Sequence, residues 1–83
     1  MKNVTVLYFA ALRELTGTAT EKLTLPDHVV TVDDFTRHLV SHTPTLASGM
    51  PSVRVAKNEA FAARGELISD GDVLALIPPV QGG

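Results

Sequence analysis

The chain opens with side chains that alternate in character along residues 4–9, VTVLYF. β-Branched and aromatic residues dominate this segment, which is typical of a strand. The even-numbered side chains from Val4 to Tyr8 share one face, and the odd-numbered side chains from Thr5 to Phe9 share the other. Both faces are partly apolar, so we expect other parts of the molecule on each side of this strand.

Two more elements are predicted in the next part of the chain. Residues 10–15 are good helix formers and Gly17 is a typical helix stop, so they predict one or two helical turns. Residues 20–25 alternate again and end at Pro26, which predicts a second strand paired with the first.

The longest predicted helix starts after Thr31, whose side chain can cap the first turn. Asp34 stands three residues further on and completes a variant of the capping box. Val32, Phe35 and Leu39 have the spacing of one buried helical stripe. These features predict a helix that ends before the next proline and packs against the sheet.

The second half of the chain predicts three more strands. Residues 44–51 are polar and contain glycine and proline, so we expect a loop there. Residues 53–57 predict a third strand, and after a turn Phe61 begins a short fourth one. The turn sequence SDGD at residues 69–72 precedes the continuous apolar run 73–77, which predicts a central strand covered on both faces.

The order of the elements defines the fold class. One main helix can cover only one face of a sheet, so the chain predicts a two-layer α+β domain. The last apolar strand is expected in the middle of the sheet, beside the first. This order is that of the β-grasp, or ubiquitin-like, fold, a mixed sheet of about five strands with one main helix across one face. We assign residues 1–77 to this domain and residues 78–83 to a flexible C-terminal tail.

Composition narrows the class of protein. Eighty-three residues make one domain, and 45% apolar with 19% charged residues fit a globular chain. A formal net charge of −2 argues against nucleic-acid binding, and no apolar run has membrane-spanning length. The absence of cysteine excludes disulfides, thiolate zinc sites and a cysteine nucleophile. We expect a cytoplasmic protein without a signal peptide.

Histidines and paired aspartates are the candidate chemical groups within the domain. Of the histidines His28, His38 and His42, the last two stand four residues apart on the long helix and can share a metal. No third ligand at a useful distance is indicated, and neither cysteine nor a nearby carboxylate pair supports a site. Solvent-facing histidines are the favoured interpretation, and we expect no metal site. Asp70 and Asp72 can bind a cation or act as paired carboxylates, but a turn explains both. We expect no catalysis by the chain alone.

The sequence PPVQGG at residues 78–83 has no obvious role in packing. Its two prolines favour a stiff, extended backbone, and six extended residues reach about 20 Å. Glycine has no Cβ, so Gly82 and Gly83 can pass through a narrow channel. We therefore expect the Gly83 carboxylate to be presented to a partner enzyme that activates it, for instance as an acyl-adenylate. A frayed end or a cloning remnant is the alternative.

An exposed apolar patch is the second candidate feature. If the helix covers one face of the sheet, then Phe9, Phe61 and Ile77 lie on or near the other face. Apolar patches on small proteins often mark interfaces. A second small core beneath the loops is the alternative interpretation.

Three blocks, VLYFAALRELTG, VRVAKNEAF and LISDGDVLALIPPVQGG, resemble the MoaD-type ubiquitin-like sulfur carriers of the MoaD/ThiS family. The blocks cover about half the chain and occur in the family's order and spacing. The resemblance implies a β-grasp fold and the role of small subunit of molybdopterin synthase, in a heterotetramer built around a dimer of large subunits. It implies no tightly bound cofactor, and most catalytic side chains belong to the large subunit.

The resemblance also implies roles for individual residues. An ATP-dependent adenylyltransferase would adenylate Gly83, and sulfur would then convert it to a thiocarboxylate. Sulfur would pass to a cyclic pyranopterin precursor inside the large subunit, with two carriers used per product. The segment that would insert into the large subunit consists of Pro78, Pro79, Val80, Gln81 and Gly82.

Partner contacts and two departures complete the comparison with the family. Phe9, Phe61 and Ile77 match positions that face the partner, and Arg13 fits a position that contacts the activating enzyme or forms a surface salt bridge. Lys57 stands where the family usually has an apolar residue, and a smaller residue usually stands in place of Gln81. Three other functions remain open: a sulfur carrier for thiamine or another pathway, a ubiquitin-like protein modifier joined through Gly83, and an interaction module with an idle tail.

Overall fold

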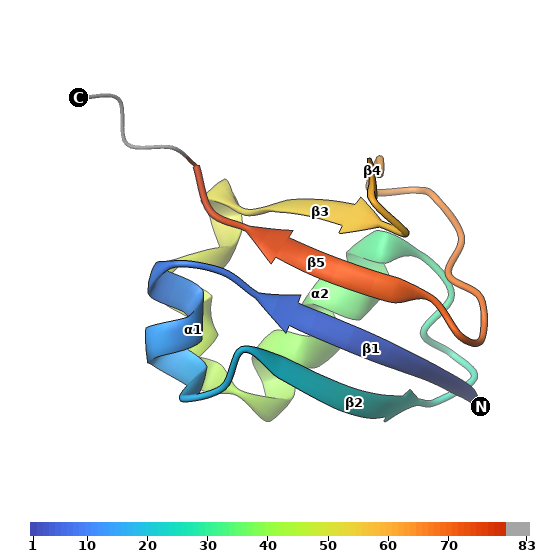
Figure 1. Ribbon diagram of the computed structural model, residues 1–83. Coiled ribbons are helices and arrows are strands. Elements are labelled where there is room, and N and C mark those ends of the chain that lie inside the picture. The colour runs from blue at the N-terminus through green and yellow to red at the C-terminus, as the bar shows by residue number, and fades with distance from the viewer. Residues whose placement is uncertain (80–83) are drawn as a thin grey trace.

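The structure is a computed structural model that describes residues 1–79 (Figure 1). Its five strands form one mixed sheet in the order β2-β1-β5-β3-β4, in which β5 lies parallel to β1 and the other neighbouring pairs are antiparallel. The strands are β1 Lys2–Tyr8, β2 Thr20–Leu25, β3 Arg54–Lys57, β4 Ala60–Phe61 and β5 Val73–Ile77. The predicted β-grasp fold is confirmed, including the central place of the last strand beside the first.

Helix α2 (Val32–His42) packs across one face of the sheet, behind it in Figure 1. The predicted capping box at its start is present. The Thr31 side chain accepts a hydrogen bond from the Asp34 N–H, and the Asp34 carboxylate accepts one from the Thr31 N–H, both at 3.1 Å. Hydrogen bonds from the backbone of Val30 and of Thr31 also lower the pKa of the Asp34 carboxyl. The capping box therefore marks the start of the helix, and the carbonyls of Glu66 and Arg64 accept hydrogen bonds from the N–H groups of Val32 and Asp33, both at 2.9 Å.

The short helix α1 (Ala11–Thr16) connects β1 to β2. It ends as predicted at Gly17, which has a φ of 77° and donates its N–H to the Arg13 carbonyl. Glycine adopts this left-handed conformation without the steric cost that a Cβ would add. The stop returns the chain into β2, which pairs with β1 from Lys2 opposite Leu25 to Leu7 opposite Thr20.

The core lies between the sheet and α2. Alternate residues of β1 and β5 point into it, and the apolar stripe of α2 covers them. The largest fully buried side chains are Phe35, Leu12, Leu25, Leu39, Leu46, Leu74, Leu76, Val6 and Val29. No helix within residues 1–79 is long and apolar enough to cross a membrane.

The predicted loop at residues 44–51 was wrong. The segment forms two 3₁₀ helices, η1 (Pro44–Ser48) and η2 (Met50–Ser52). Proline in the first turn of each helix suits these short helices, because its fixed φ is already helical and the first N–H groups have no partner within a helix. Leu46 is fully buried and anchors η1 beneath α2. One buried leucine in a polar segment was too weak a signal to reveal this packing.

The prediction that β5 is covered on both faces was also wrong. Leu74 and Leu76 are fully buried under α2, but Val73 is 36% exposed, and Ala75 and Ile77 are only half-buried. The same asymmetry holds for β1, where the face of Val4, Val6 and Tyr8 is buried and the opposite face is not. Within residues 1–79, nothing packs over the second face of the central strands as α2 packs over the first.

Candidate partner-binding groove

The uncovered face of the sheet holds a concave surface with a volume of about 640 Å³, called here the sheet groove. It collects side chains from β1, β3, β4 and β5 and from the turn between β3 and β4. Most of its lining is apolar: Leu7, Phe9, Ala56, Phe61, Val73, Ala75 and Ile77. Asn58 and Glu59 line one end. An apolar concave surface of this size on so small a domain is typical of a binding site.

The structure brings three of the predicted interface residues into this groove. Phe9 is 47% exposed, Phe61 is 59% exposed, and Ile77 is half-buried. The alternative of a second small core does not describe these side chains, because none of the three is buried. Arg13 is exposed on α1 and is not among the residues that line the groove. Whether these four residues contact a partner stays a prediction.

The position of Phe9 depends on the residue that follows β1. Ala10 has a φ of 51°, which is unusual for a residue with a Cβ. The turn places Phe9 outside both β1 and α1, while its carbonyl accepts a hydrogen bond of 3.1 Å from the Leu12 N–H. The chain thus turns sharply away from the sheet and leaves the aromatic ring on the open side.

Phe61 is positioned by a tight turn between β3 and β4. Asn58 and Glu59 both have positive φ, 50° and 73°, as a two-residue hairpin turn requires. The guanidinium of Arg54 lies over the Phe61 ring, 4.2 Å from its centre. This contact places a positive charge at the rim of the groove, beside its most exposed aromatic ring.

A polar network that sequence reasoning missed holds this turn against β5. The Asn58 side chain donates to the Asp72 carboxylate at 2.9 Å and accepts from the Val73 N–H at 2.9 Å. The other oxygen of Asp72 accepts from the Ser69 N–H at 2.8 Å. Asp72 is only 7% exposed, so these bonds satisfy a buried carboxylate. The only signals of this network in the sequence were the asparagine at the turn, Asn58, and the second aspartate after a glycine, Asp72.

The two aspartates considered as a cation site have structural roles. Asp70 accepts a hydrogen bond of 2.6 Å from the Asn3 N–H, which ties the turn at residues 69–72 to β1. Asp72 belongs to the network that holds Asn58. Both carboxylates therefore fix the start of β5 and the groove that lies against it. This outcome agrees with the interpretation of the segment as a turn.

The three histidines line a separate pocket between β2 and α2. The His38 and His42 rings lie 4.2 Å apart between centres. Within residues 1–79, no group of three or more histidine, aspartate or glutamate side chains has the arrangement to hold a metal ion. Burial lowers the pKa of His38, and the charges of His42 and His28 act in the same direction.

Lys57 and Tyr8 show how charged and polar groups near the sheet are satisfied. Lys57 donates to the Leu67 carbonyl and pairs with Glu66, both at 3.0 Å, which explains a lysine at a position where an apolar residue was expected. The Tyr8 hydroxyl donates to Glu21 at 2.8 Å. Burial, followed by this hydrogen bond and the Glu21 charge, raises the Tyr8 pKa. Neither residue belongs to the groove.

Strand β5 leads from the groove into the predicted tail. Ile77 is the last residue of β5 and pairs with Arg54 of β3. Pro78 is half-buried, and Pro79 is exposed. The remaining residues of the predicted tail, Val80, Gln81, Gly82 and Gly83, lie outside the described residues. The predicted division into a domain and a tail stays a prediction.

The fold and the groove together define a ubiquitin-like β-grasp protein with an apolar binding face beside its last strand. The model of the ThiS family matches residues 6–83, and the chain belongs to this family. The family predicted from the sequence motifs is therefore confirmed.

Three named proteins, one eukaryotic and two archaeal, are similar to the chain over nearly its whole length. The molybdopterin synthase sulfur carrier subunit of Chlamydomonas reinhardtii is 35% identical, over 96% of this chain and 98% of its own length. A putative molybdopterin converting factor subunit 1 from Pyrococcus furiosus has a TM-score of 0.85 and 27% identity, covering 96% of this chain and all of its own. SAMP1 from Haloferax volcanii has a TM-score of 0.82 and 36% identity, covering 98% of this chain and 99% of its own.

Proposed function

We propose that this protein is the sulfur carrier subunit of a molybdopterin synthase and acts in the cytoplasm. The observation that supports the proposal most strongly is the sheet groove, an apolar face whose floor includes the strand that leads to the diglycine. A carrier needs this arrangement, because the partner that binds the face must also receive the tail. Relatives that match the chain over nearly its whole length carry the same name.

The proposed chemistry uses the carboxylate of Gly83 and takes place in two activation steps. A carboxylate oxygen attacks the α-phosphorus of ATP within an adenylyltransferase, pyrophosphate leaves, and an acyl-adenylate forms. A sulfur nucleophile equivalent to hydrosulfide then attacks the acyl carbon, and AMP leaves. The product is a thiocarboxylate, in which sulfur has replaced one oxygen. The chain needs no cofactor of its own, since ATP and sulfur come from partners.

Sulfur transfer would take place inside the large subunit. The groove residues Phe9, Phe61 and Ile77 bind that subunit, while the segment from Pro78 to Gly82 extends into its active site. The thiocarboxylate sulfur attacks a carbon of the cyclic pyranopterin precursor, and an oxygen substituent of that carbon leaves. Water then hydrolyses the thioester, which leaves the sulfur on the precursor and restores the carboxylate at Gly83. Arg13, exposed on α1, is available to the activating enzyme without disturbing the groove. Two carriers per heterotetramer would supply the two sulfur atoms of one dithiolene.

A protein modifier is the second candidate function. A Haloferax volcanii structure described as small archaeal modifier protein 1 has a TM-score of 0.83 with this chain and 34% identity. Both functions start from the same acyl-adenylate and differ in the nucleophile that attacks it. A sulfur nucleophile gives a thiocarboxylate, whereas a lysine amine of another protein gives an isopeptide bond.

Intact-mass spectrometry distinguishes the two functions. The chain is incubated with a candidate adenylyltransferase, ATP and a sulfide donor, with a variant that lacks Gly83 as the control. The proposal predicts a species in which one oxygen has become sulfur, formed by the wild type alone. Covalent adducts to other proteins without that species would instead establish a modifier. An unchanged mass with an adenylyltransferase that modifies a related carrier would contradict both.

A further inference from the structure

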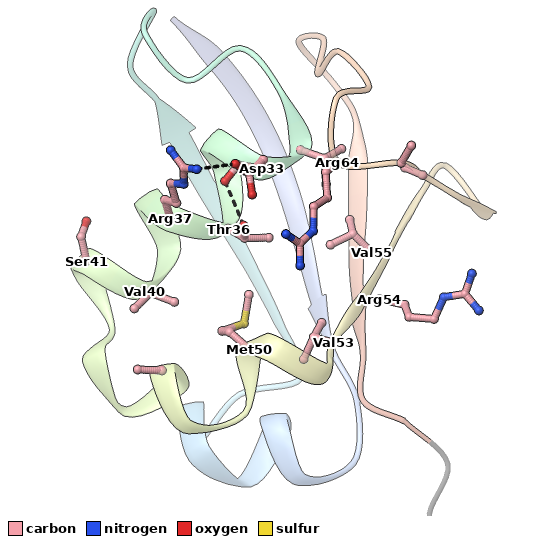
Figure 2. Close-up of a pocket in the computed structure, with 14 residues that line it drawn as sticks. Asp33, Thr36, Arg37, Val40, Ser41, Met50, Val53, Arg54, Val55 and Arg64 are labelled. Carbon is pink, nitrogen blue, oxygen red and sulfur yellow. Dashed lines mark hydrogen bonds and ion pairs between the residues drawn. The ribbon is translucent and has the colours of Figure 1, made fainter.

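A second concave surface lies on the helix-covered side of the sheet (Figure 2). It has a volume of about 650 Å³ and lies between α2, the two 3₁₀ helices, β3 and the segment that follows β4; we call it the helix-side pocket. Side chains alternate along β3 and the extended residue before it, so Val53 and Val55 line this pocket while Ala56 lines the sheet groove. The two concave surfaces therefore lie on opposite faces of the same edge of the sheet.

The floor of the helix-side pocket is apolar and incompletely covered. Val40, Met50, Val53 and Ala62 pack against the core but remain only partly buried. In Figure 2 the labelled Val40, Met50 and Val53 surround the open centre of the pocket. Contiguous apolar surface of this kind on a small domain favours an interaction site, because its burial by a partner releases water from it.

The rim of the pocket carries an excess of positive charge. Three of the chain's four arginines line it, namely Arg37, Arg54 and Arg64, and Asp33 is the only acidic residue among them. Asp33 is already paired with Arg37 at 2.8 Å. Within residues 1–79, neither Arg54 nor Arg64 takes part in an ion pair. The pocket is thus positive in a chain whose formal net charge is −2.

The two free arginines have different positions at this rim. Figure 2 shows the Arg64 side chain extending over the middle of the pocket, whereas Arg54 points away from it at the edge. Arg54 lies over the Phe61 ring and so stands between the pocket and the sheet groove. A ligand in the pocket would meet Arg64 first, and one that reaches past the edge of β3 would also meet Arg54.

The polar groups of the pocket favour a peptide over a small molecule. Small-molecule sites orient their ligand with a few buried polar groups that converge on it. Here the hydroxyl of Thr36 donates to the Asp33 carbonyl at 2.9 Å, and that of Ser41 donates to the His38 carbonyl at 2.8 Å. Both hydroxyls are used by the helix itself. The remaining polar contacts available to a ligand are the arginines of the exposed rim.

We propose that the helix-side pocket is a docking site for an acidic segment of a partner protein. Apolar side chains of that segment pack on Val40, Met50 and Val53, and a carboxylate of the segment pairs with Arg64. Because the pocket and the sheet groove lie on opposite faces, this segment binds while the groove is occupied. The surface thus gives the protein a second partner, independent of the chemistry at Gly83.

A titration with a short synthetic peptide tests this docking site. The peptide alternates glutamate with leucine and valine, and it is added to the full-length, isotope-labelled chain while backbone amide resonances are followed. We expect shifts along residues 32–41, 50–55 and 62–64, with a dissociation constant below about 1 mM. Leu7 and Val73, which line the sheet groove, should not shift. Shifts centred on these two groove residues would overturn the proposal.

Two control peptides separate the two parts of the interaction. One carries lysine in place of glutamate, and the other carries serine in place of leucine and valine. Neither should bind, because the proposed site needs both carboxylates and apolar side chains. Equal binding of either control would overturn the proposal. Concentration-dependent shifts at the same residues without peptide would assign the pocket to a second copy of this chain, and would overturn it too.

Matched variants test directly whether Arg64 contributes to peptide binding. Arg64→Glu should weaken peptide binding about fivefold, since it replaces one attractive rim contact by a repulsive one. Arg64→Lys should retain most of the affinity, because it keeps the charge. Lys22→Glu makes the same change of charge at an exposed position on β2, outside the pocket, and should leave the affinity unchanged. Equal losses in Arg64→Glu and Lys22→Glu would show only an effect of net charge and contradict the proposed site.

Discussion

The two faces of the sheet are made of the same strands but serve different purposes. On β5, Leu74 and Leu76 are fully buried beneath α2, while their neighbours Val73, Ala75 and Ile77 line the open groove. Full burial of a leucine stabilises a domain by about 1.5–3 kcal/mol relative to its exposure. The covered face therefore stabilises the fold. The open face keeps its apolar surface exposed in the free protein, which is where a partner gains most by covering it.

The same division appears in the hydrogen bonds on the two sides of the sheet. Asp34 and Thr31 fix the start of the helix on the covered side. Asn58 and Asp72 fix the turn that presents Phe61 on the open side. Polar groups thus hold both layers in place, but on the open side they hold exposed apolar side chains rather than a core. This comparison predicts opposite consequences for changes on the two faces.

The largest difference should separate two adjacent residues of β5. Leu76→Ala removes a fully buried side chain and should lower the free energy of unfolding by about 3 kcal/mol. Ile77→Ala alters the open face and should cost about 1 kcal/mol or less, because its side chain is only half-buried. Chemical denaturation of both variants measures the difference. Equal losses would contradict the assignment of the core to one face.

A charge on the open face should affect binding more than stability. Phe61→Asp should weaken binding to the large subunit about 30-fold, because it places a charge within the proposed apolar interface. Leu67→Asp is the matched control, since Leu67 is 61% exposed but lies outside the groove. Calorimetric titration of both variants gives the affinities. Similar affinities for the two variants would exclude the groove as the binding face.

Loss of the Asn58 side chain should loosen the turn that carries Phe61. Asn58→Ala leaves a buried carboxylate without one partner and forces a Cβ-bearing residue to keep a φ of 50°, so we expect a loss of about 2 kcal/mol. Asn58→Gly accepts that φ readily and should lose only the side-chain hydrogen bonds. Thermal denaturation compares the stabilities of the alanine and glycine variants with that of the wild type. A glycine variant as stable as the wild type would show that those bonds contribute nothing.

Acidification should weaken the helix layer slightly through His38. Burial and the nearby histidine charges hold its folded-state pKa below the ordinary value of 6.5, so folding favours the neutral ring. The contribution of the neutral His38 ring to the free energy of unfolding is present above pH 6.5. It is lost as the pH falls through the lowered folded-state pKa. His38→Gln should therefore show a smaller fall in unfolding free energy between neutral pH and about pH 5. A fall as steep as that of the wild type would contradict this role.

Elements with strong local signals could be predicted from the sequence. The capping residues Thr31 and Asp34 and the stripe of Val32, Phe35 and Leu39 defined α2, and Gly17 defined the end of α1. These signals depend on neighbours in the chain, so they are visible without the fold. The continuous apolar run of residues 73–77 also predicted the central place of β5 beside β1.

Features that depend on distant contacts could not be predicted in the same way. The 3₁₀ helices rest on burial of Leu46 beneath α2, which the polar residues around it do not reveal. The run VLALI looked covered on both faces, because a sequence does not distinguish apolar side chains that pack in a core from those that stay partly exposed. The bond between Asn58 and Asp72 joins residues 14 positions apart. The groove residues could be predicted because the strands are apolar on both faces, whereas one main helix can cover only one face.

Sulfur transfer in a reconstituted reaction tests the central claim most directly. The chain is first charged as a thiocarboxylate and then mixed with a molybdopterin synthase large subunit and the cyclic pyranopterin precursor, and formation of the dithiolene product is measured. The account predicts product from the wild type, none from the variant lacking Gly83, and strongly reduced formation from Phe61→Asp. If the wild-type thiocarboxylate binds the large subunit but yields no dithiolene product, the proposed function is contradicted.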